Sequence, residues 1–147
     1  MKVLTKAFGP VDVDERQKVT FPSGLFGFES IKEYVLVDAE RQPFFWLQSM
    51  EAEHIAFIIV NPFLFRQDYE LDIDDELLKE IGISSPEDAL IFSIVTIPPA
   101  GPMTANLQGP LIINRKTRIG KQGILTDPRW KTKHDIMQEL NQAGSSC

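Results

Sequence analysis

Apolar and polar residues alternate along several short segments of this chain, and turn residues such as Gly, Pro and Asn separate the segments. Strict alternation is typical of a β-strand with one buried face, because successive side chains point to opposite sides of a sheet. Val11 and Val13 follow this pattern, and so do Val19 and Phe21. The predicted strands are Lys2–Phe8, Val11–Asp14, Lys18–Phe21, Glu33–Val37, Phe44–Gln48, Ala56–Val60, Tyr69–Ile73, Leu90–Ile97, Thr104–Leu107, Leu111–Asn114 and Gln122–Leu125.

Two further segments have the spacing of short helices. Residues 74–82 begin with acidic side chains, which suit the positive end of a helix dipole, and they end at Gly82, a residue that terminates helices. Leu77 and Leu78 begin an apolar stripe on this helix. The second predicted helix, Lys133–Leu140, is short enough to need the body of the protein or a partner to form. The pattern as a whole predicts a mostly-β domain, either a compact barrel or a sandwich.

Composition sets the size and environment of this domain. The chain has 147 residues, enough for one domain with a sizeable core, and 43% are hydrophobic, which argues against a disordered chain. The single cysteine, Cys147, excludes an internal disulfide and a zinc site built from cysteines. No apolar stretch has the length of a signal-peptide core or a membrane-spanning helix. We therefore expect a cytoplasmic protein without a membrane segment.

The net charge of −6 is unevenly distributed along the chain. Residues 67–88, the acidic segment, carry a formal charge of −8, and residues 115–133, the basic segment, carry +6. Small β-barrels that bind single-stranded nucleic acid use basic residues with exposed aromatic rings, and Trp130 lies in the basic segment. The acidic segment would nevertheless repel phosphate, so we expect no direct contact with nucleic acid.

Signals for catalysis and for cofactors are weak in this sequence. The two histidines, His54 and His134, have no neighbour at the spacing of a metal site. Segment 24–27 lacks the third glycine of a dinucleotide fingerprint, and the acidic segment lacks the spacing of a calcium loop. We therefore predict no catalytic residues, no metal and no cofactor. A small hydrolase stays an open alternative, because the members of a catalytic triad come together only in space.

Three loops combine apolar residues with residues that constrain the backbone. Pro62 ends a predicted strand, and Phe63 follows it in a connection of the kind that lies at the surface. A proline-rich loop ends at Met103, and a third loop runs between Asn106 and Asn114, whose side chains are suited to bind backbone groups. Each loop has two interpretations: the apolar residues fold back onto the core, or they form an exposed patch for a partner.

Four sequence segments occur in a characteristic order. They are Phe21–Glu29 (FPSGLFGFE), Pro43–Ser49 (PFFWLQS), Asn61–Phe63 with Asp68–Glu70, and Asn106–Asn114 (NLQGPLIIN) followed by Gly120 and Gln122. Over about residues 1–130 the chain thereby resembles the FliW family of bacterial flagellar assembly factors. Two positions depart from the family pattern: Gly109 stands where the family more often has Ala, and the basic residues beyond Asp127 match only loosely.

The resemblance implies a non-enzymatic binding protein with a small antiparallel β-barrel-like fold and one or two short helices. Members of the family bind the RNA-binding translational regulator CsrA beside its RNA surface and relieve its repression of flagellin mRNA. Flagellin competes for the same protein, so that free flagellin controls its own synthesis. A flagellin-specific chaperone or adaptor, or an RNA-binding barrel, is the alternative. We expect a FliW-like domain over residues 1–130, a short helix with a disordered tail over residues 131–147, and a monomer when the protein is free.

A partner switch of this kind assigns roles to two groups of residues. The RNA-facing surface of CsrA is expected to be basic, so an acidic surface would be steered toward it and would then repel RNA. The expected steering residues are Asp68, Glu70, Asp72, Asp74, Asp75 and Glu76. The expected partner-binding residues, which combine apolar anchors with residues that shape their loops, are Asn61, Pro62, Phe63, Leu64, Met103, Asn106, Leu107 and Ile112.

Overall fold

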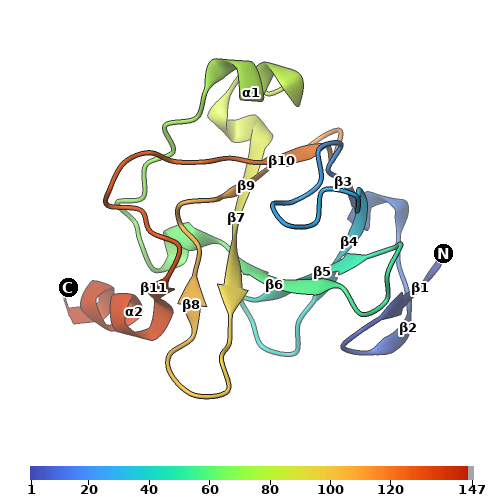
Figure 1. The fold of residues 1–147 in the computed structure, drawn as a ribbon, viewed down its shortest axis with the longest axis horizontal. Coiled ribbons are helices and arrows are strands. Elements are labelled where there is room, and N and C mark those ends of the chain that lie inside the picture. The colour runs from blue at the N-terminus through green and yellow to red at the C-terminus, as the bar shows by residue number, and fades with distance from the viewer. Residues whose placement is uncertain (146–147) are drawn as a thin grey trace.

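A long central strand, β7 (Ala89–Thr96), connects the two parts of the main sheet (Figure 1). Its first half pairs with β9 (Leu111–Asn114), and its second half pairs with β6 (Ala56–Val60) and β8 (Thr104–Ala105). All of these pairings are antiparallel. The sequence of β7 is almost continuously apolar rather than alternating, because its two faces pack against different core clusters: Leu90, Phe92 and Ile94 face one, and Ala89 and Ile91 face another.

The structure, a computed structural model, describes residues 1–145. The other strands of the main sheet are β3 (Lys18–Thr20), β4 (Glu33–Asp38), β5 (Phe45–Ser49), β10 (Gly120–Gln122) and β11 (His134–Asp135). They follow the order β10-β9-β7-β6-β5-β4-β3, and β11 extends the branch that begins at β8. A separate antiparallel pair consists of β1 (Lys2–Thr5) and β2 (Gly9–Asp12). The prediction of a mostly-β, antiparallel domain is thus confirmed.

The two ends of the main sheet approach each other without closing into a barrel. Thr20, at the end of β3, makes one isolated parallel bridge to Ile119, just before β10. The Thr20 amide donates to the carbonyl of Arg118 at 3.0 Å. A closed barrel requires a continuous ladder at this seam, and one bridge does not supply it. Among the described residues, the main sheet therefore has open edges and does not form a closed barrel.

Helix α1 (Asp75–Glu80) confirms the first predicted helix. The Asp74 side chain accepts a hydrogen bond from the Glu76 amide at 3.1 Å, which caps the helix, and Gly82 has a φ of +75° just beyond its end. Helix α2 (Ile136–Ser145) starts three residues later than predicted, because His134 and Asp135 pair with β8. Part of the predicted disordered tail is thus helical, and Ser146 and Cys147 lie outside the described residues. Three 3-10 turns are η1 (Glu15–Gln17), η2 (Pro62–Leu64) and η3 (Pro86–Asp88).

The predicted strand Tyr69–Ile73 is wrong, because this segment pairs with no strand among residues 1–145. Its alternation nevertheless corresponds to a real difference in burial. Tyr69 is buried, Leu71 and Ile73 pack half-buried against the same core cluster, and the acidic residues between them are exposed. An extended chain laid over a core produces the same period of two as a paired strand, so the pattern alone does not separate the two.

The segment beyond residue 130 is built into the core. Trp130 and Ile136, on either side of the expected domain boundary, are both buried in one cluster with Val60, Phe65 and Tyr69. The division at residue 130 stays a prediction, but the packing joins residues 131–136 to the main body. No helix within residues 1–145 is long and apolar enough to cross a membrane. Among the same residues, no group of three or more His, Cys, Asp or Glu side chains is placed to bind a metal ion.

Candidate protein-interaction groove

The 3-10 turn η2 places two large apolar side chains at the surface. The Asn61 side chain accepts a hydrogen bond from the Phe63 amide at 3.0 Å, and Pro62 occupies the first position of the turn, where no amide hydrogen is needed. Pro62 is buried, whereas Phe63 and Leu64 remain 36% and 47% exposed. The local sequence Asn-Pro thus fixes a turn that presents the next two residues outward.

A groove of about 550 Å³ lies between η2, α1 and the start of β7. Its walls are mostly apolar, with a few polar residues among them. The lining residues are Phe63, Leu71, Ile73, Asp75, Leu78, Lys79, Ile83, Ser84, Ser85, Pro86, Ala89, Ile91 and Ile112. A hollow of this size and character is suited to receive a row of apolar side chains from a partner segment.

The side chain of Phe63 lines this groove and packs against a buried neighbour. Its ring packs against Tyr69, with the ring centroids 5.7 Å apart. The buried Tyr69 hydroxyl donates to the Leu107 carbonyl. Burial raises the pKa of Tyr69, so the hydroxyl stays protonated and keeps this hydrogen bond across the physiological range. The arrangement fixes the position from which Phe63 would contact a partner.

Three of the expected apolar anchors do not lie at the open surface. Leu107 is fully buried in the cluster around Trp130, and Ile112 is buried beneath the groove. Met103 is half-buried against the cluster around Trp130, and its carbonyl accepts a hydrogen bond from the Ile136 amide at 3.1 Å. Leu107 therefore belongs to the core, whereas Ile112, on β9, is buried but lines the groove, and its role in contacting a partner stays a prediction. Of these apolar positions, Phe63 and Leu64 are the exposed ones.

The two asparagines that flank this segment bind backbone groups, as their sequence positions predicted. Asn106 Oδ1 accepts hydrogen bonds from the amides of Gln108 and Gly109, at 3.1 and 2.9 Å. Asn114 is buried, and its Nδ2 donates to the carbonyl of Ile81 at 2.9 Å. Asn106 thus shapes a turn, and Asn114 ties the end of α1 to β9. A role of Asn106 in contacting a partner stays a prediction.

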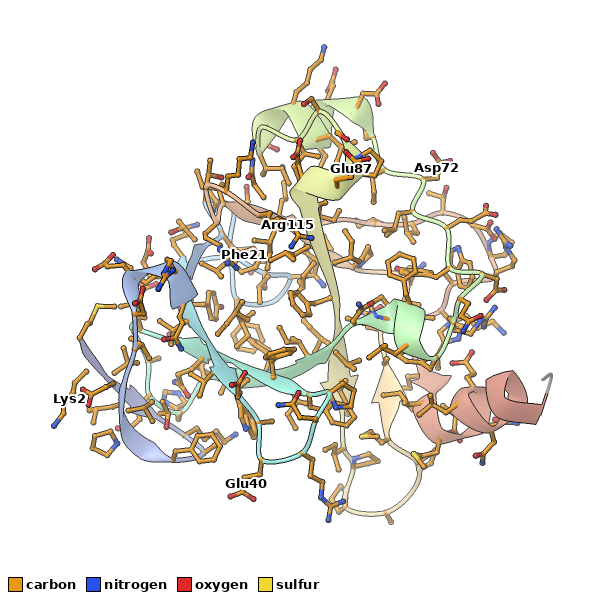
Figure 2. The ribbon with its side chains drawn as sticks, turned by 180° about the vertical axis from the view of Figure 1, so that it is seen from behind. Lys2, Phe21, Glu40, Asp72, Glu87 and Arg115 are labelled. Carbon is orange, nitrogen blue, oxygen red and sulfur yellow. The ribbon has the colours of Figure 1, made fainter. Side chains whose placement is uncertain are left out.

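Basic side chains from the basic segment, together with Arg66, neutralise part of the acidic segment in space. Arg66 pairs with Asp68 at 2.8 Å, and Arg129 reaches Glu70 at 3.3 Å. Lys121 pairs with Glu80. Asp72, Asp74, Asp75 and Glu76, by contrast, are exposed and have no ion-pair partner within residues 1–145. Figure 2 shows Asp72 and Glu87 toward the end of the molecule that carries α1, away from Lys2 and Glu40. Within the acidic segment, the negative charge available to a partner is therefore concentrated around α1.

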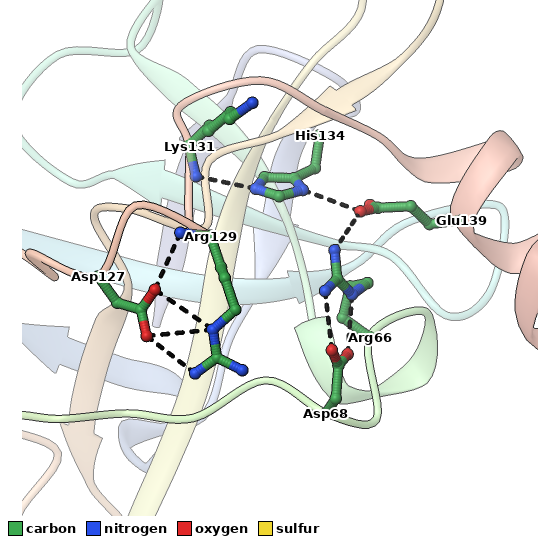
Figure 3. A network of polar contacts seen from close by, with 7 residues as sticks. All are labelled: Arg66, Asp68, Asp127, Arg129, Lys131, His134 and Glu139. Atoms are coloured by element: carbon green, nitrogen blue, oxygen red, sulfur yellow. Dashed lines mark hydrogen bonds and ion pairs between the residues drawn. The ribbon is translucent and has the colours of Figure 1, made fainter.

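A polar network that the sequence did not predict fastens α2 to Arg66, just beyond η2 (Figure 3). The Lys131 amide donates to His134 Nε2 at 2.8 Å, so this nitrogen is the acceptor and Nδ1 carries the proton. That Nδ1 lies 2.8 Å from Glu139 Oε1, which also accepts from Arg66 Nη1 at 2.7 Å. No sequence spacing connects Arg66 to Glu139, which is 73 residues away. The network could be found only once the tertiary fold had brought η2 and α2 together.

The Arg66–Asp68 pair makes stability depend on pH at the acid end. Hydrogen bonds from Arg66 are the main cause that lowers the pKa of Asp68 below its ordinary value of 3.8. Because the folded state has the lower pKa, the pair stabilises the protein above pH 3.8 and loses this effect as the pH falls through the folded-state value. Asp68 is exposed and the pair is screened, so we expect Asp68→Asn to cost about 0.2–1 kcal/mol at pH 7.

Thermal unfolding of both proteins between neutral pH and strong acid measures this effect. The difference between wild type and Asp68→Asn is expected to shrink toward zero at pH values well below 3.8. A difference that stays constant over the whole range would contradict the assignment, because it would show that the substitution acts through something other than the carboxylate charge.

Comparison with known proteins agrees with the sequence resemblance. The family model described as FliW protein matches residues 2–136. The flagellar assembly factor FliW of Treponema denticola is 55% identical over 145 residues, covering 98% of this chain and 99% of that protein. The corresponding protein of Treponema pallidum is 50% identical over 141 residues, covering 95% of this chain and 94% of its own length.

A solved structure is similar over nearly the same extent. The crystal structure of the flagellar assembly factor FliW superposes with a TM-score of 0.85 at 38% sequence identity. The match covers 92% of this chain and 96% of that one. The overall fold described above has therefore already been seen by crystallography.

Proposed function

The chain belongs to the FliW family of flagellar assembly factors, which are not enzymes, and we propose from this premise that it acts as a partner switch. In this proposal it binds CsrA and relieves the repression of flagellin mRNA, and flagellin competes with CsrA for it. The proposal places its action in the cytoplasm, where the mRNA is translated. The free protein is expected to be a monomer.

The observation that carries the proposal is an apolar groove beside carboxylates that are exposed and form no ion pair within residues 1–145. The groove presents Phe63, Leu78 and Ile91, a lining suited to the apolar face of a helix. We assign it to a helical end of flagellin. Asp72, Asp75 and Glu76 on the same side of the molecule would attract a basic partner and, once it is bound, repel RNA phosphates from it.

Isothermal titration against purified CsrA and against flagellin monomer tests the function. Binding of both partners, with each reducing the heat of the other, is the expected result. Heat from flagellin alone would favour the flagellin-specific adaptor. Heat from neither partner would overturn the proposal.

Replacing Phe63 with Asp tests the groove. The ring is exposed enough for the variant to fold, and a charge at this position opposes an apolar helix face, so we expect flagellin affinity to fall about thirtyfold. CsrA affinity is expected to change less than about threefold, because Phe63 is not expected to be one of the anchors for that partner. Titration of both partners measures the two effects.

The matched control for this variant is Phe8→Asp. Phe8 is 38% exposed, like Phe63, and lies in the turn between β1 and β2, away from α1 and η2 (Figure 1). This variant is expected to bind both partners normally. Equal losses in both variants would show a general effect of added charge, and a loss of the thermal transition in Phe63→Asp would identify Phe63 as a core residue.

One observation keeps RNA binding as a second candidate function. A hollow of about 430 Å³ between η1 and the β9–β10 turn is lined by five cationic side chains on this otherwise acidic chain. They are Arg16, Lys18, Arg115, Lys116 and Arg118. Binding of a single-stranded RNA with an affinity that falls steeply as salt rises would support this function. An RNA affinity below detection at low salt would exclude it.

A further inference from the structure

The loop after β3 displays an aromatic ring to solvent on a fixed backbone. Gly24 and Gly27 have φ values of +69° and +87°, and between them Leu25 is buried while Phe26 is 53% exposed. The Phe28 amide donates to the Leu25 carbonyl at 2.8 Å, closing the turn. Leu25 and Phe28 thus pack inward, and the turn leaves Phe26 exposed between them.

A long-range hydrogen bond holds this turn against β10. The Phe26 amide donates to Oε1 of the buried Gln122 at 2.9 Å, and Gln122 Nε2 donates to the Gly109 carbonyl at 3.0 Å. Ile124, two residues beyond Gln122, is 63% exposed. The buried Gln122 side chain therefore holds the turn that carries Phe26 close to the segment that carries Ile124, although the two residues are far apart in the sequence.

These two side chains border a second hollow beside α1, of about 720 Å³. Leu77 and Ile73 line it, as do the carboxylates of Asp74, Glu76 and Glu80 and the ammonium group of Lys121, which pairs with Glu80. The Phe63 groove uses Asp75, Leu78 and Lys79 of the same helix. Helix α1 therefore divides two surfaces, and Ile73 lines both of them.

We propose that the second hollow, with Phe26, Ile124 and the carboxylates of Asp74 and Glu76, docks a basic protein surface that carries a small apolar patch. The inference rests on the proposed function, in which that basic partner is CsrA. Asp74 and Glu76 have no ion-pair partner within the described chain, so their charge is available to a partner, and Phe26 supplies the aromatic anchor that protein interfaces favour.

This arrangement makes the two partners exclude each other without sharing their anchors. An ordinary interface covers about 800 Å² on each protein, which is a patch about 30 Å across. A helix with its side chains is only about 10–12 Å wide. A partner seated on either side of α1 therefore extends over the helix onto the other surface. Flagellin in the Phe63 groove and CsrA on the Phe26 surface would thus compete.

Titration of Phe26→Ser and Ile124→Ser against CsrA and flagellin tests the proposal, with Phe8→Ser as the matched control. Both side chains are exposed, so thermal midpoints near wild type are expected. Each variant is expected to lose at least about tenfold in CsrA affinity while flagellin affinity stays within about threefold, and Phe8→Ser is expected to match wild type. If one variant fails to fold, the other still decides the question.

The outcomes separate this inference from the proposed function. If both variants bind CsrA as tightly as the wild type does, the assignment of CsrA to the Phe26 surface is overturned. The proposed partner switch is not affected by that result. Equal losses of CsrA and flagellin affinity would also overturn the assignment, because they would place both partners on one surface. Binding of neither partner by wild type would overturn the proposed function, and the inference with it.

Discussion

Replacing Trp130 with Ala is expected to lower the free energy of unfolding by about 3–5 kcal/mol. The indole is buried in the cluster that joins β6, β8 and the C-terminal segment, and it meets Tyr69 edge-on with ring centroids 4.8 Å apart. The guanidinium carbons of Arg66 and Arg129 each lie 4.8 Å from its ring. Removing it leaves a cavity and frees both cations from an aromatic contact.

Urea unfolding of wild type, Trp130→Ala and Trp130→Phe measures the effect. The indole nitrogen makes no hydrogen bond among the described residues, so Trp130→Phe keeps much of the packing and breaks no polar contact. It is expected to cost less than half as much as Trp130→Ala. A loss below about 1.5 kcal/mol for the alanine variant would contradict the prediction, since it lies under the range for a buried aromatic. Such a result would mean that the C-terminal segment containing Trp130 does not form part of the cooperative core.

Replacing Gly24 with Ala is expected to destabilise the protein by about 2–5 kcal/mol. The backbone of Gly24 is left-handed, which costs an L-residue about 1–2 kcal/mol, and its site is buried. A Cβ there would come within 2.5 Å of Glu29 Cα, and both atoms belong to parts that cannot rotate away. The turn would have to open, at a further cost of about 1–3 kcal/mol.

Gly27→Ala is the matched control, because Gly27 also has a positive φ but has no atom within 4 Å of an added Cβ. Its expected cost is about 1–2 kcal/mol, from backbone strain alone. Thermal and urea unfolding measure both variants, and the difference between them isolates the clash at Gly24. Equal effects would show that the close approach of Glu29 is not maintained in solution.

Much of the fold could be predicted from local patterns because local physics produces them. The Asp74 cap and the Gly82 stop determine α1 within a few residues, and Asn61-Pro62 determines the turn at η2. The hydrogen bonds that Asn106 Oδ1 accepts from Gln108 and Gly109, and those that Asn114 Oδ1 accepts from Lys116 and Thr117, likewise reach only a few residues along the chain. These features depend on short sequence separations, and a single sequence displays them directly.

The contact surface was harder to predict, since exposure depends on what the rest of the chain covers. Leu107 and Ile112 have the same apolar character as Phe63, yet they are buried. Phe26 sits in a segment that reads as a glycine-rich turn, and only the hydrogen bond to Gln122, 96 residues away, shows how it is held beside Ile124. Nothing in the local pattern distinguishes these cases.

The sequence by itself determined the mostly-β class, the first helix, the family and the concentration of acidic residues in one segment. Only the tertiary structure decided which of those acidic residues stay unpaired and which apolar residues remain exposed. The physical reason is that pairing and burial are properties of contacts between distant residues. Arg66, Lys121 and Arg129 neutralise part of the acidic segment, and the carboxylates around α1 are left for a partner.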